Sequence, residues 1–143
     1  MVTWKTNVET VHTVLIVTDQ PETAASWSTL FNQRNCIVIS EANRSDAVQS
    51  ARLMDPSLLV VDIQLGTAER SEFLQELRAA SRGPILMLIS ANTVEEIVEA
   101  NHSGADECLV KPVNPAVLVV KAMAWLGHGH RSERISSPIS VTL

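Results

Sequence analysis

Four polar side chains each follow a short apolar run in the sequence, and together they combine groups that can do chemistry. They are Asp19, Asp62, Ser90 and Lys111. Two carboxylates, a hydroxyl and an ammonium in one place would offer charges of both signs and a hydrogen-bond donor to a charged reactant. Taken singly, such residues often only end a strand or cap a helix. The set is therefore far more specific than any one of its members.

The elements that must position this set follow an alternating pattern. Between Val11 and Leu126, apolar strand-like runs alternate five times with helix-like stretches, which is typical of a parallel sheet covered by helices on both faces. The first, third and fourth runs are apolar without alternation and predict central strands. In such a sheet the active crevice lies at the carboxyl ends of the strands, where the four polar residues come together. The runs are Val14–Val17, Cys36–Ile39, Leu58–Val61, Ile85–Ile89 and Leu109–Val110.

Helix boundaries are marked by residues with a known role at helix ends. Pro21 and Pro115 each predict the first residue of a helix, because proline lacks only an N–H that would be unpaired there. Ser45 is the expected N-cap of the second helix, and Thr93 with Glu96 fits a capping box that opens the fourth. Glycine reaches the left-handed conformation common at helix C-termini. Three glycines are expected to end helices in this way: Gly83, Gly104 and Gly127.

Length and composition limit the classes of protein. The 143 residues suffice for one domain, and no apolar run is long enough to span a bilayer. Cys36 and Cys108 lack the spacing of a metal site, so a reducing cytoplasm is the expected location. The formal charge of −5 gives no overall attraction to a phosphate backbone. We therefore expect no contact with nucleic acid by this domain and no membrane association.

Both ends of the chain differ from the domain between them. Residues 1–10 are expected to form an N-terminal extension, residues 11–127 the domain, and residues 128–143 a linker or C-terminal tail. The alternation of Ile139, Val141 and Leu143 resembles a strand that has no place in a finished five-stranded sheet. We expect an effector domain beyond Leu143, although an accidental pattern in a short tail is about equally compatible. His128 and His130 lack a third metal ligand and are expected to be solvated.

Four segments, in order and spacing, resemble the successive motifs of two-component response-regulator receiver domains. The resemblance covers nearly all of residues 11–127. Within the family, the winged-helix DNA-binding regulators are the class that the chain could belong to. It implies a flavodoxin-like, doubly wound α/β fold, (βα)5, with the five parallel strands in the order 2-1-3-4-5. The segments are Val14–Pro21, Leu59–Leu65, Ser90–Ala91 and Gly104–Pro112.

The resemblance implies a role for each polar residue. Asp62 would accept a phosphoryl group from a histidine kinase or a phosphotransfer protein. Asp19, Asp62 and the backbone carbonyl of Gln64 would hold Mg²⁺, which prefers oxygen ligands. Lys111 would pair with one phosphoryl oxygen and Ser90 would donate a hydrogen bond to another. Such a domain is a signalling switch and no enzyme, apart from its own phosphorylation and dephosphorylation.

Four positions depart from the family pattern. Thr18 replaces one of two adjacent acidic residues, so weak binding of Mg²⁺ is expected. Gly66 replaces a usual proline and Arg70 a usual glycine, so the loop after Asp62 is expected to have a different shape. Cys108 replaces the aromatic residue that usually responds to the serine hydroxyl, which puts the usual signal relay in question.

The fifth helix predicts a surface for self-association. It is apolar around more of its circumference than one side of a sheet can cover, so some of Val117, Val120 and Met123 must face outward. By resemblance, winged-helix regulators dimerise through the fourth helix, fifth strand and fifth helix by means of complementary charges. Here an apolar homodimer is expected, to which the charged residues Asp106, Glu107 and Lys121 can contribute.

Three other functions compete with the phosphorylated switch, whose output would be transcriptional. A pseudo-receiver would keep the fold and bind partners without phosphate, as Thr18 and Cys108 suggest. A flavin mononucleotide protein is disfavoured by the acidic segment 19–22, where a phosphate needs open N–H groups. A haloacid-dehalogenase-type phosphatase needs a second carboxylate where Gln64 has an amide.

Overall fold

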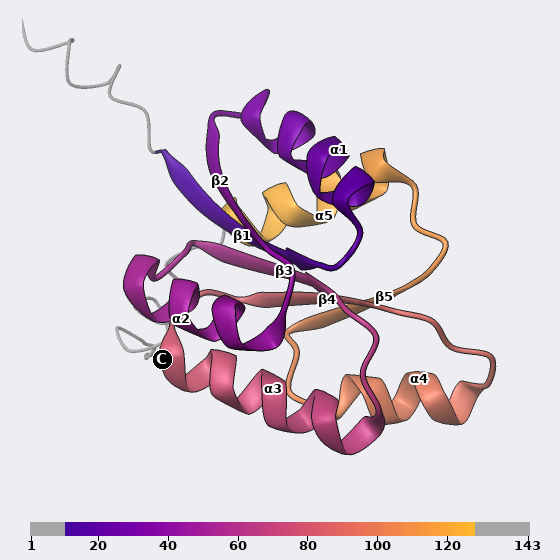
Figure 1. Cartoon of the computed structure of the whole chain (residues 1–143). Coiled ribbons are helices and arrows are strands. Elements are labelled where there is room, and N and C mark those ends of the chain that lie inside the picture. Colours follow the sequence, from indigo (N-terminus) through magenta and orange to yellow (C-terminus); the bar gives the residue numbers. More distant parts are fainter. Residues whose placement is uncertain (1–10, 128–143) are drawn as a thin grey trace, which may run out of the picture.

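The computed structural model of the protein describes residues 11–127, in which strands and helices alternate (Figure 1). The strands are β1 (His12–Thr18), β2 (Cys36–Glu41), β3 (Leu58–Asp62), β4 (Ile85–Ile89) and β5 (Glu107–Val110). The helices are α1 (Pro21–Asn32), α2 (Arg44–Met54), α3 (Thr67–Ala80), α4 (Val94–Asn101) and α5 (Pro115–Gly127). None of these helices is long and apolar enough to cross a membrane.

The strands form one parallel sheet in the order β2-β1-β3-β4-β5, which confirms the predicted fold. β1, β3 and β4 lie inside the sheet, as their uninterrupted apolar runs predicted, and β2 and β5 form its edges. Helices α1 and α5 cover one face, and α2, α3 and α4 cover the other (Figure 1). Because all strands run in the same direction, all five carboxyl ends lie along one side of the sheet, which we call the carboxyl edge.

Each face of the sheet has its own apolar core, since successive strand side chains point to opposite faces. Leu15 and Val17 of β1 belong to the core under α2, α3 and α4. Val14 and Ile16 of the same strand belong to the core under α1 and α5. Trp27 of α1 is buried in this second core. The two cores fix the sheet between its helix layers and so hold the polar edge in place.

Most predicted helix starts are correct, and one is wrong. α1 begins at Pro21 and α5 at Pro115, and Thr93 and Glu96 form the expected capping box of α4. α2, however, begins at Arg44 rather than after Ser45. Its N-cap is Asn43, whose side chain accepts a hydrogen bond from the Asp46 N–H at 2.9 Å. An Asn two residues earlier offers the same capping oxygen, and the sequence alone could not choose between them.

The predicted role of Gly83 is also wrong. Among the described glycines only Gly104 has a positive φ, of 118°, and it lies beyond the end of α4. α3 ends at Ala80, and Gly83 lies in the turn to β4, where a Cβ atom would come within 2.4 Å of the Pro56 carbonyl oxygen. Gly83 is therefore needed for the close approach of two backbone segments. Gly127 is the last residue of α5, without a left-handed conformation.

Gly83→Ala should destabilise the domain by about 1–3 kcal/mol, because the added methyl group forces the backbone at Pro56 to move. Equilibrium unfolding in urea measures this change. Gly127→Ala is the control, since a Cβ there meets no atom within 4 Å, and it should be neutral or slightly stabilising. Equal effects of the two substitutions would show that the contact with Pro56 is not restrictive.

Candidate functional site

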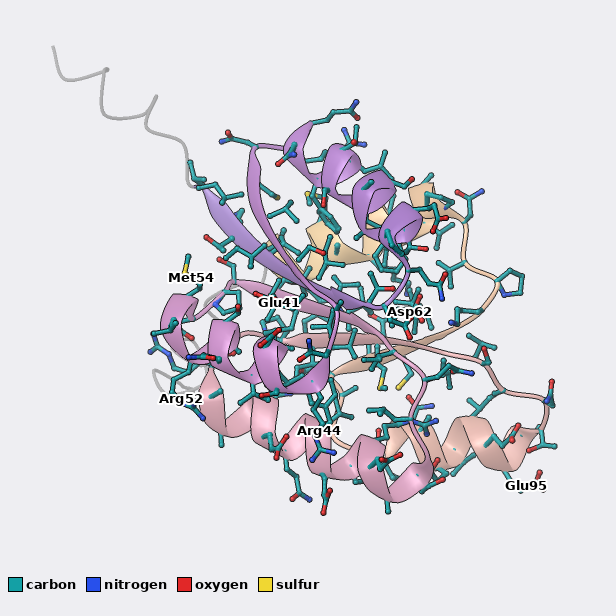
Figure 2. All side chains as sticks on the ribbon, viewed as in Figure 1. Glu41, Arg44, Arg52, Met54, Asp62 and Glu95 are labelled. Atoms are coloured by element: carbon teal, nitrogen blue, oxygen red, sulfur yellow. The ribbon has the colours of Figure 1, made fainter. Side chains whose placement is uncertain are left out.

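The closest contact of the predicted set joins Lys111 to Asp62. Asp62 is the last residue of β3, and Lys111 follows β5, where its N–H donates to the Ile89 carbonyl at 2.8 Å. The Lys111 side chain extends past β4 and places Nζ 2.7 Å from Asp62 Oδ1. Figure 2 shows Asp62 at the edge of the sheet beside α1. The parallel topology thus brings together two residues separated by most of the second half of the domain.

The ion pair is partly withdrawn from water. The Asp62 side chain is 11% exposed and the Lys111 side chain 32%. A charge-assisted hydrogen bond in such surroundings is stronger than one on the open surface. Lys111 therefore neutralises Asp62 while leaving its second carboxylate oxygen available to a reactant.

Asp19 and Thr18 lie beside Asp62 but have different surroundings. Thr18 pairs with Asp62 in the register of β1 and β3, and Asp19 is the next residue along the chain. Thr18 is only 3% exposed, and its Oγ1 accepts a hydrogen bond from the Gln20 N–H at 3.2 Å. Asp19 is exposed, and its Oδ1 accepts a bond from Gln20 Nε2 at 3.4 Å. Thr18 therefore shapes the backbone, and Asp19 is the open carboxylate.

Ser90 lies at the same edge without touching the ion pair. It is exposed directly after β4, and no hydrogen bond to Asp62 or Lys111 is present within residues 11–127. The loop after it is fixed by Glu96 Oε1, which accepts bonds from the Asn92 N–H at 2.5 Å and the Thr93 N–H at 3.1 Å. These N–H groups lower the pKa of Glu96. The loop that carries Ser90 is thus joined to the first turn of α4.

A divalent cation would find few protein ligands here. In the part of the chain that the structure describes, no three His, Cys, Asp or Glu side chains gather closely enough to hold a metal ion. Asp19 and Asp62 supply two carboxylates, and Gln64 is an exposed residue of the following loop. Mg²⁺ commonly binds through one or two carboxylates and keeps several waters. These residues therefore fit Mg²⁺, but they are too few for an ion that needs more protein ligands.

The first turn of α1 adds residues that the sequence analysis missed. A groove of about 380 Å³ opens beside Asp62 and Lys111. A larger groove of about 590 Å³ lies between α2 and α3, where none of the four predicted residues contributes. Pro21 marked the start of α1, but only the fold shows that this turn faces the loop after β5. The residues lining the first groove are Glu22, Thr23, Ser26, Trp27, Asp62, Leu88, Lys111, Val113 and Pro115.

Comparison with known proteins identifies the family. Residues 14–123 match the response regulator receiver domain. The chain belongs to the response regulator receiver family. A CheY-like receiver domain from Methanospirillum hungatei superimposes with a TM-score of 0.74 at 23% identity, covering 86% of this chain and 99% of that one. At this identity the superposition supports the fold alone.

The relatives of this receiver domain include transcriptional regulators. The regulator CusR of Escherichia coli is 30% identical over 117 residues, which are 81% of this chain and 52% of that protein. The regulator AfsQ1 of Streptomyces coelicolor is 27% identical over 124 residues, which are 87% of this chain and 55% of that protein. The chain therefore spans about half the length of the curated relatives it matches.

Two departures of this receiver domain from the family pattern lie close together. Arg70 lies within α3, and its Nη1 is 2.9 Å from Glu99 Oε1 of α4. Cys108 of β5 points under α4, where its thiol donates to the Ala100 carbonyl at 3.5 Å. Burial raises the pKa of this thiol, and the positive charge of Arg70 offsets part of that rise. An ion pair between α3 and α4 thus lies beside the position where the family has an aromatic ring.

Thr18→Asp should tighten Mg²⁺ binding by about ten-fold, because it adds a carboxylate next to Asp19 and Asp62. The new carboxylate can still accept the Gln20 N–H bond that Thr18 holds. Isothermal titration measures the affinity. Thr18→Val, which removes the oxygen but keeps the shape, is the control and should leave the affinity unchanged. Equal affinities of wild type and Thr18→Asp would contradict this account of the site.

Proposed function

We propose that the chain is a phosphorylation-dependent switch that accepts a phosphoryl group on Asp62 from a histidine kinase or a phosphotransfer protein. The observation that supports this most strongly is the 2.7 Å contact between Lys111 and Asp62 at the carboxyl edge of the sheet. A carboxylate without a nearby cation would repel the anionic donor, and the neighbouring ammonium of Lys111 offsets that repulsion.

The residues of the site would share the work of transfer. One Asp62 oxygen forms the new P–O bond while the donor bond to phosphorus breaks and the leaving group keeps the bonding pair. Lys111 then turns to a phosphoryl oxygen, and Ser90 donates to another after its loop moves inward. Bound Mg²⁺, held by Asp19, Asp62 and the Gln64 carbonyl, would supply further neutralisation of the phosphoryl charge.

The wild-type protein should gain the mass of one phosphoryl group when incubated with acetyl phosphate and saturating Mg²⁺. Asp62→Asn keeps the size and shape of the side chain and should gain none, because an amide oxygen is a poor nucleophile. Intact-protein mass spectrometry distinguishes the two outcomes. An unmodified wild type would refute phosphorylation and favour the pseudo-receiver, a phosphate-independent binding module.

Specific observations favour that second candidate function. The Thr18 hydroxyl is committed to the backbone of Gln20, so the pocket lacks one carboxylate of the family pattern. Cys108 is held against Ala100 and has no ring that could swing toward Ser90. The intact Lys111–Asp62 pair is the reason that we rank phosphorylation first.

The switch would act through an effector domain beyond Leu143, with a transcriptional output in the cytoplasm. Support comes from the relatives, which are transcriptional regulators about twice as long as the matched region. The expected linker at 128–143 and the N-terminal extension at 1–10 lie outside the described residues. The gene sequence past Leu143 tests the idea, and a stop codon there would refute it.

We further propose that the domain forms homodimers through α4, β5 and α5 by apolar contact. Val120 of α5 is 68% exposed, and Val117 is exposed beside it, whereas Met123 is partly buried against the core. Each of the three elements carries at least one exposed valine, and exposed apolar side chains that gather on one surface are typical of a partner site. These residues are Val94, Val98, Val110, Val117 and Val120.

The charged residues expected to contribute to this surface already have partners within the domain. Lys121 Nζ lies 2.9 Å from Glu107, and Trp125 Nε1 donates to the same carboxylate at 2.6 Å. Burial alone would raise the pKa of Glu107, but these two donors lower it overall. Asp106 pairs with Arg78 at 2.6 Å, at the opposite end of the strands from Asp62. The contact would therefore depend chiefly on the valines.

Sedimentation should show a dimer for the wild type and a monomer for Val120→Glu, because the substitution buries an unpaired charge in the interface. The dimer should change little with salt or phosphodonor, since apolar burial is not screened by ions. Leu53→Glu on α2 is the matched control, because Leu53 is 75% exposed outside this surface. A monomeric wild type, or equal dimerisation of both variants, would contradict the proposal.

A further inference from the structure

The groove beside Asp62 contains a second carboxylate with no assigned role. Glu22 lies in the first turn of α1 and lines the same groove as Asp62 and Lys111. Its side chain is exposed, and no ion pair to it is present within residues 11–127. Its charge is therefore unpaired by any described side chain at the wall of this groove.

The charge balance of the site makes this carboxylate important. The ammonium of Lys111 is matched by Asp62 at 2.7 Å. Asp19 and Glu22 then remain as two exposed negative charges, since the only partner of the Asp19 side chain among residues 11–127 is the Gln20 amide. A cation bound by Asp19 and Asp62 would neutralise the first. Glu22, which lines the groove from the first turn of α1, would remain as a negative charge.

We propose that Glu22 determines which phosphodonors Asp62 accepts, a role that rests on the proposed phosphorylation. It disfavours donors whose leaving group is anionic and favours N-phosphoryl donors that present a protonated nitrogen or another cation beside the phosphorus. The physical reason is Coulombic, because like charges in a narrow groove repel and opposite charges attract.

The rest of the groove agrees with such a donor. The walls combine the hydroxyls of Thr23 and Ser26 with the apolar surfaces of Trp27 and Val113. These groups offer hydrogen bonds and apolar contact to the part of the donor beyond the phosphorus. Transfer would form the bond from Asp62 oxygen to phosphorus as the P–N bond breaks. The leaving nitrogen would keep the bonding pair and depart as a neutral amine, because its positive charge is cancelled when the P–N bond breaks.

Two simpler roles for Glu22 predict different behaviour. As an acidic residue in the first turn of a helix it could serve only to stabilise α1, in which case substitution would change stability and leave donor preference alone. As a ligand of Mg²⁺ it would affect reactions with all donors equally through metal affinity. Measuring the preference between donors at saturating Mg²⁺ therefore distinguishes donor selection from both simpler roles.

The test compares rates of Asp62 phosphorylation by acetyl phosphate and by phosphoramidate at saturating Mg²⁺. Acetyl phosphate is a dianion at neutral pH with an anionic leaving group, whereas phosphoramidate carries a protonated nitrogen. Glu22→Gln should raise the ratio of the acetyl phosphate rate to the phosphoramidate rate by about five-fold at low salt. The change should shrink as ionic strength rises, and Glu22→Asp should resemble wild type.

Glu95→Gln is the matched control, because Glu95 is an exposed acidic residue in the first turn of α4, well apart from Asp62 (Figure 2). It should leave the ratio unchanged. A wild type that reacts with both donors while Glu22→Gln keeps the same ratio would overturn the role of Glu22 alone. A wild type that reacts with neither donor would overturn the phosphorylation on which it rests.

Discussion

The function proposed for this protein depends on one interaction, the contact of the Lys111 ammonium with the Asp62 carboxylate across the end of β4. A parallel sheet is what makes it possible, since it brings all strand ends to one edge although the residues are distant in sequence. The two apolar cores hold that edge rigid from both faces. A lysine side chain loses conformational freedom when it stays on a single carboxylate oxygen. Because the cores already fix the strand ends, no further backbone ordering is needed to form the contact.

The sequence predicts the fold well because the strong signals are physical ones. Uninterrupted apolar runs identified β1, β3 and β4 as central, and prolines marked the starts of α1 and α5. Local signals failed where two residues offer the same chemistry, as Asn43 and Ser45 do at the start of α2. They also failed at Gly83, where a glycine is required because the Pro56 backbone, distant in sequence, leaves no room for a Cβ atom.

The same limit applies to the site. Residues at strand ends could be placed from the sequence because the topology brings them together. Glu22 could not be placed in the same groove as Lys111, because that groove depends on how the loop after β5 approaches α1. The partners of Glu107 and Asp106 within the domain were equally hidden, since long side chains choose among several oppositely charged neighbours only in the folded state. The contribution of these charged residues to an interface therefore stays a prediction, while their partners within the domain are known only from the fold.

The departures from the family pattern bear on how a signal could leave the site. The loop after Ser90 is fastened to α4 by Glu96, and α4 is fastened to α3 by the Arg70–Glu99 pair. An inward movement of Ser90 toward a phosphoryl group would therefore act on α4 through Glu96, and the Arg70–Glu99 pair would carry it on to α3. Exposed valines of α4 would then move with the helix.

Binding of beryllofluoride with Mg²⁺, followed by amide NMR, tests the central role of the Lys111–Asp62 pair most directly. The wild type should show saturable shifts at Asp62, Ser90 and Lys111, because the anion occupies the position of a phosphoryl group. Lys111→Met should stay folded and bind about ten-fold or more weakly, since it removes the only ammonium in contact with Asp62 within the described residues. Equal binding by Lys111→Met, or no shifts in the wild type, would contradict the account.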